Sequence, residues 1–68
     1  MNKQTVGNNI KTRRVKLGMS RQDLAYATGI SMYSISGYEQ GKTMMSLDKA
    51  CRLAEAMGCK VSDLTDEG

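Results

Sequence analysis

SRQDLAYATGISMYSISGYEQG, residues 20–41, is the stretch that decides the fold of this chain. Its pattern predicts two short amphipathic helices joined by a tight turn at Gly29 and Ile30. Ser20 can cap the first of them through its side-chain oxygen, and Asp23 follows at the spacing of a capping box. Two helices packed at a large angle across a short glycine turn form a rigid supersecondary unit.

The second helix of this unit begins after Ser31, a second serine cap that is preceded by the apolar Ile30. Ile35 and Tyr38 are expected to point inward, and Gly41 is expected to end the helix. Leu24, Ala25 and Thr28 are expected to form the inner face of the preceding helix. Gly37 weakens the second helix by roughly 1 kcal/mol relative to alanine. This arrangement is one that proteins use to hold a helix in the major groove of DNA.

The flanking sequence predicts a helix on the N-terminal side, over about residues 5–17, with Gly18 as its stop. Its apolar positions are Val6, Ile10, Val15 and Leu17, and its expected exposed positions are Lys11, Arg13, Arg14 and Lys16. On the C-terminal side, residues 42–45 form a loop and Ser46 caps a fourth helix that ends at Gly58. Its expected apolar stripe comprises Leu47, Ala50, Cys51, Leu53, Ala54 and Met57, and Val61 and Leu64 indicate a short fifth helix.

The predicted fold class is therefore all-α: a single domain over residues 1–68, a compact five-helix bundle with an ordered core over about 5–64. Its positive charge is concentrated in the N-terminal part. Residues 1–43 carry a net charge of +5 and residues 44–68 carry −2. This asymmetry favours a polyanionic partner on one face, although the charges could also simply solvate the surface.

Several functions are disfavoured by composition. The chain has no histidine, so a zinc finger is excluded and no nucleophile–base pair can be assembled, and we expect neither an enzyme nor a metal site nor a cofactor. Cys51 and Cys59 are expected to lie too far apart for a disulfide, and to be buried or half-buried thiols. No apolar run is long enough to span a membrane, and the polar N-terminus is unlike a signal peptide, so we expect a cytoplasmic protein.

The sequence resembles the phage repressor and Cro-like helix-turn-helix family over about residues 6–64. The resemblance rests on Ile10, Arg14, residues 18–20, Leu24-Ala25, residues 29–31, residues 34–36, residues 38–42, Ser46-Leu47 and residues 53–58. It implies a lambda-repressor-like fold and a sequence-specific transcription regulator, most simply a repressor. It also implies a homodimer on double-stranded DNA with a pseudo-palindromic operator.

The resemblance also implies roles for individual residues. Base-reading positions correspond to Ser31, Met32, Tyr33, Ser36 and Gly37, and phosphate-binding positions to Arg21, Gln22, Ser34, Lys42 and Thr43. Arg14 is expected to pair with Glu39 as a structural ion pair between the first and third helices. The chain departs from the family pattern at Arg21, where glutamine is usual, and at Gly37, which can offer a base only its backbone.

Alternatives remain open at this stage. Tyr33 could fold back onto the protein and Met32 could cover the core, and any single lysine could be merely solvated. The domain could instead be a protein-interaction module on the same fold, such as an antitoxin or adaptor, with weak DNA binding. A single-stranded RNA binder is the third and most remote alternative, because such proteins stack bases on an exposed aromatic platform and none is evident from the sequence. For a dimer surface, we expect exposed apolar residues near Met57, Val61 and Leu64.

Overall fold

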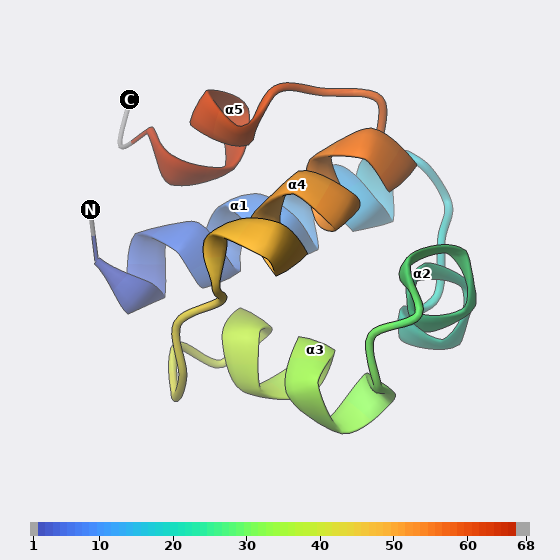
Figure 1. Cartoon of the computed structure of the whole chain (residues 1–68), viewed down its shortest axis with the longest axis horizontal. Helices are drawn as coiled ribbons and strands as arrows, with labels where there is room; N and C mark the ends of the chain where they lie inside the picture. The colour runs from blue at the N-terminus through green and yellow to red at the C-terminus, as the bar shows by residue number, and fades with distance from the viewer. Residues whose placement is uncertain (1, 67–68) are drawn as a thin grey trace.

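Five helices account for most of residues 2–66, the part of the chain that the structure, a computed structural model, describes. They are α1 (Lys3–Lys16), α2 (Arg21–Thr28), α3 (Met32–Glu39), α4 (Leu47–Ala56) and α5 (Val61–Thr65). α1 packs against α3 and α5, and α2 packs against α3 and α4 (Figure 1). No strand occurs within residues 2–66, so the all-α prediction is confirmed.

Local capping explains where the helices begin. Ser20 Oγ accepts from the Asp23 amide at 2.9 Å and Asp23 Oδ2 accepts from the Ser20 amide at 2.9 Å, so the predicted capping box is present. Ser31 and Ser46 cap α3 and α4 in the same way, as predicted. α1 begins two residues earlier than expected, because Asn2 accepts from the Thr5 amide at 2.8 Å and acts as its cap.

The turn between α2 and α3 depends on Gly29. Its φ of 74° lies in the left-handed region, where residues with a Cβ are strained. Its amide donates to the Ala25 carbonyl at 2.9 Å and closes the last turn of α2. The chain therefore reverses over a short distance, and Ile30 is buried directly after the turn.

The core contains one large, fully buried side chain from each helix. These are Ile10, Leu24, Ile35, Leu53 and Leu64, each with no exposed surface. Burial of each contributes roughly 1.5–3 kcal/mol to folding. Ile35 is the member of this set from α3, so α3 is held against the other helices through the hydrophobic core.

α1 and α3 approach each other closely at Gly7. A Cβ at this position would lie 2.9 Å from the Glu39 carbonyl oxygen and would also collide with the Tyr38 carbonyl oxygen. Backbone atoms cannot move aside as the end of a flexible side chain can. Gly7 therefore sets the distance between α1 and the C-terminal end of α3.

The predicted inner face of α1 was partly wrong. Val15 and Leu17 are 59% and 51% exposed, whereas Arg14, expected on the surface, is buried. The buried positions Val6, Ile10 and Arg14 are spaced by four residues and so share one face of the helix. Val15 is one residue out of that register, and Leu17 follows the last helical residue.

The apolar stripe of α4 is shorter than predicted. Leu47 is 74% exposed at the first turn and Cys51 is exposed, one residue out of register with Ala50. Cys59 is partly buried, and both thiols are free. The expected dimer surface was also wrong in part, because Met57 and Leu64 are core residues. Within residues 2–66, no helix is long and apolar enough to cross a membrane.

Candidate nucleic-acid interface

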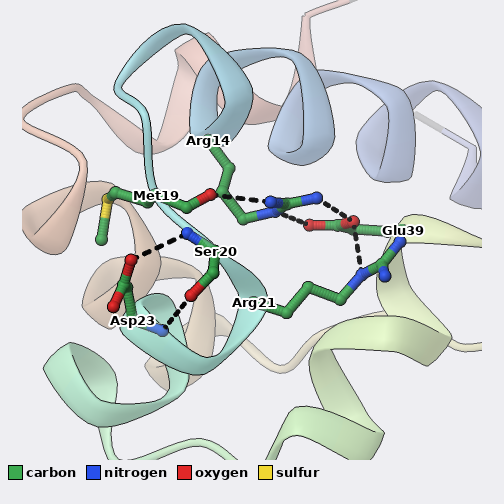
Figure 2. A network of polar contacts seen from close by, with 6 residues as sticks. All are labelled: Arg14, Met19, Ser20, Arg21, Asp23 and Glu39. Atoms are coloured by element: carbon green, nitrogen blue, oxygen red, sulfur yellow. Dashed lines mark hydrogen bonds and ion pairs between the residues drawn. The ribbon is translucent and has the colours of Figure 1, made fainter.

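Glu39, at the C-terminal end of α3, joins three helices through its carboxylate (Figure 2). Its Oε2 accepts from Arg14 Nε at 2.7 Å, and its Oε1 accepts from Arg14 Nη2 at 3.1 Å and from Arg21 Nε at 3.0 Å. Only 1% of the Glu39 side chain is exposed. The carboxylate therefore fixes α3 to α1 and to the first residue of α2.

Arg14 is the inner partner in this network. Besides Glu39, it donates from Nη1 to the Met19 carbonyl at 2.8 Å, and thereby holds the segment between α1 and α2. The hydrogen bonds that Arg14 donates to the Glu39 carboxylate raise the pKa of Arg14 above its ordinary value, against the opposing effect of burial. Arg14 therefore stays positively charged in this pair.

Arg21 is the outer partner, and 39% of its side chain is exposed. The contact with Glu39 uses Nε and Oε1. Arg21 is also the first residue of α2, and the leading amides of a helix have no intrahelical acceptor. Gln22 follows it and is exposed. The start of α2 thus combines a cationic side chain, free amides and the positive end of a helix dipole, which together favour an anion.

The outward face of α3 is solvent-accessible at its N-terminal end. Tyr33 is 90% exposed and Met32 is 47% exposed. The alternative in which Tyr33 folds back onto the protein is therefore wrong. Ser31 is exposed, and its hydroxyl is 3.1 Å from that of Ser34, which is half-buried. Tyr26 on α2 is also 93% exposed.

A shallow hollow lies beside this face, between α3 and the loop that follows it. It is lined by Tyr33, Ser34, Ser36, Gly37, Gln40, Lys42 and Thr43. Six of these seven are predicted base- or phosphate-contacting residues, which the structure brings together at one place. Ser31, Met32, Arg21 and Gln22 lie outside the hollow, at the starts of α3 and α2.

Gln40 belongs to the hollow but was not among the predicted residues. It is exposed and lies directly after α3. A spacing of seven residues from Tyr33 puts Gln40 on the same side of the helix. Helical periodicity counted from Tyr33 could therefore have identified it.

The geometry described above is that of a helix-turn-helix unit, and a helix-turn-helix family model matches residues 10–64. The chain belongs to the Cro/CI-type helix-turn-helix family. The match covers α2, α3 and α4 completely and α1 and α5 in part, and it confirms the resemblance inferred from the sequence.

Two relatives of this helix-turn-helix domain were compared with it. A protein of Pyrococcus furiosus named as an HTH-type transcriptional regulatory protein is 41% identical over 49 residues, which cover 72% of the chain. The chain spans only 16% of the length of that relative. The crystal structure of the restriction-modification controller protein from Aeromonas hydrophila superposes with a TM-score of 0.88 at 26% identity. That superposition covers 91% of this chain and 94% of the controller protein.

Proposed function

We propose that this helix-turn-helix domain binds double-stranded DNA sequence-specifically as a transcription regulator, most simply a repressor. The observation that carries the proposal is the fixation of α3 at its C-terminal end by Glu39, while Tyr33 at its N-terminal end is 90% exposed. A rigidly held helix with a free outer face fits the major groove, which admits one α-helix. The regulator and controller functions named for the two relatives support the same proposal.

In this proposal, base contacts come from the face of α3. Tyr33 offers a hydroxyl to a base edge, and Met32 offers an apolar contact to a thymine methyl. Ser31 and Ser36 add hydroxyls at the start and middle of the same face. Strong bidentate readers such as arginine and asparagine are absent from these positions, so DNA shape contributes to the specificity.

Phosphate contacts would flank that face. Arg21, Gln22 and Ser34 lie near the starts of α2 and α3, and Lys42 lies in the loop after α3. Such contacts set the position of the domain on the duplex without selecting a sequence. The acidic residues of the C-terminal part lie outside this set, consistent with one DNA-facing side.

We further propose a homodimer on a two-fold pseudo-palindrome, with the two half-sites about one helical turn apart. A partly apolar hollow lined by Met44, Met45, Ser46, Leu47, Ala50, Val61 and Thr65 is the candidate contact surface for a second copy. Met44 and Met45 of this lining belong to the loop that follows α3, so a partner bound there would lie next to that loop. We also propose a cytoplasmic location of bacterial or phage type, in association with the nucleoid, where a DNA-binding regulator acts.

Selection of bound duplexes from a random pool, followed by binding at rising salt, tests the proposal. We expect one enriched pseudo-palindrome, and an affinity that falls by on the order of 10³ between 50 and 200 mM salt if about six phosphates are contacted. An antitoxin or adaptor would enrich no sequence and would bind random duplex weakly at every salt concentration. Leu47→Glu should shift the sedimentation of the protein to that of a monomer, and unchanged sedimentation would exclude this surface as the dimer contact.

A further inference from the structure

Gly37 lies in the middle of the outward face of α3, one helical turn after Tyr33, and it is partly buried although it has no side chain. The loop after α3 folds back over it. The Gly37 carbonyl accepts from the Lys42 amide at 2.9 Å and from the Thr43 amide at 3.5 Å. A Cβ at Gly37 would lie 3.0 Å from Thr43 Oγ1.

Thr43 therefore occupies the space that a side chain at residue 37 would need. Its hydroxyl lies against the middle of α3, inside the hollow, and Thr43 as a whole remains exposed. Lys42 differs from Thr43, because its long, flexible side chain can extend to the edge of a DNA groove. Two neighbouring loop residues thus have different positions relative to the α3 face.

From this geometry we infer that Thr43 is a specificity-determining residue, which contacts the base pair that Gly37 faces. The inference rests on the proposed DNA-binding function and replaces the expected phosphate contact of Thr43. A threonine hydroxyl can donate to or accept from a base edge, and its methyl group can pack against a thymine methyl. A side chain at residue 37 would meet the Thr43 hydroxyl at 3.0 Å, so a larger residue there would force Thr43 to shift.

The test compares variants in selection from a random duplex pool and in binding to the selected site. Thr43→Val keeps the shape and removes the hydroxyl, and Gly37→Ala adds a methyl group 3.0 Å from Thr43 Oγ1, so that Thr43 must shift. Both should change the preference at the same base pair of each half-site, by roughly 5- to 100-fold. Binding to random duplex should stay within about 2-fold of the unmodified protein. Thr43→Ser, which keeps the hydroxyl, shows whether the hydrogen bond or the methyl contact carries the preference.

Lys42→Ala is the matched control from the adjacent residue. It should weaken binding to selected and random duplex by the same factor and leave the selected sequence unchanged. The inference is overturned if Thr43→Val leaves the preference unchanged, or if it weakens both duplexes equally, as a phosphate contact would. Changes at different base pairs for Thr43→Val and Gly37→Ala would also overturn it. If the unmodified protein enriches no sequence, the proposed function itself fails, and that outcome is distinct from all of these.

Discussion

Arg14 and Glu39 form a bidentate ion pair between α1 and α3, with Nε–Oε2 at 2.7 Å and Nη2–Oε1 at 3.1 Å. The side chains are 9% and 1% exposed, so the pair is shielded from water. Arg21 donates to the same carboxylate and supplies a second positive charge. The orientation of α3 thus depends on one buried carboxylate, and removal of a partner from a buried pair leaves the remaining charge poorly compensated.

Arg14→Met should destabilise the domain by about 3 kcal/mol, at the lower end of the range for a broken buried pair because Arg21 remains. For a domain of this size the loss corresponds to a fall in Tm on the order of 10–20 °C. Arg52→Met is the matched control, since Arg52 pairs with Asp48 on the surface with side chains 50% and 68% exposed. It should cost less than about 0.5 kcal/mol. Thermal unfolding of both variants measures the difference in stability between them. Similar losses of stability in Arg14→Met and Arg52→Met would contradict the prediction.

Gly7→Ala should destabilise the domain by about 1–3 kcal/mol, although alanine is the better helix former. The added Cβ meets the Tyr38 and Glu39 carbonyl oxygens, and α1 and α3 must move apart to accommodate it. Gly37→Ala is the control inside α3, where the added Cβ meets a side-chain hydroxyl of the loop. Denaturant unfolding should show a clear loss for the first variant and little loss for the second. Equal denaturant midpoints for the two variants would mean that the contact between α1 and α3 tolerates a side chain at residue 7.

The capping box predicts a pH dependence. The Ser20 amide, followed by the Ser20 hydroxyl, holds the pKa of Asp23 below its ordinary value of 3.8. A carboxyl group with a lowered pKa in the folded state stabilises the protein above its ordinary pKa. That contribution is lost as the pH falls through 3.8 toward the folded value. Asp23→Ala should therefore lower the midpoint of unfolding at pH 6. The difference in midpoint between this variant and the unmodified protein should become smaller toward pH 3. A gap that stayed constant with pH would contradict this account.

The two thiols should react at different rates. Cys51 is exposed, whereas burial raises the pKa of the partly covered Cys59 above its ordinary value of 9.0. Alkylation with iodoacetamide at pH 8, followed by peptide mass analysis, should therefore label Cys51 first. In Cys51→Ser the remaining thiol should react slowly until the protein is unfolded in guanidinium. Faster labelling of Cys59 in the native protein would show that its environment is more open than described.

Tyr33→Ala should reduce discrimination between the selected site and random duplex by roughly 10-fold. Tyr33 makes few contacts with its own domain, being 90% exposed, so its loss should leave Tm almost unchanged. Competition binding at fixed salt measures the ratio of the two affinities. A fall in affinity for both duplexes by the same factor would move Tyr33 from the base-reading group to the phosphate-binding group.

The helix boundaries could be predicted from sequence because caps are local interactions. Ser20, Ser31 and Ser46 each bond an amide three residues ahead, and glycine after each of the first four helices offers a left-handed stop. Each such contact lies within a few residues of chain, so residue type and spacing are enough. The five-helix architecture and the helix-turn-helix unit follow from these boundaries and from the helical spacing of the apolar residues.

Tertiary structure alone decided how far the covered sides of α1 and α4 extend. Arg14 shares a buried face with Ile10, whereas Leu47, in the first turn of α4, is 74% exposed. The contact of Arg21 with Glu39 and the position of Thr43 over Gly37 depend on how separate segments pack against one another. Helical periodicity specifies that a residue shares a face with its neighbours, but the segments brought against that face determine whether it is buried. The chain sequence therefore predicted the helix-turn-helix unit, and the packing of the loop after α3 placed the Thr43 hydroxyl beside Gly37.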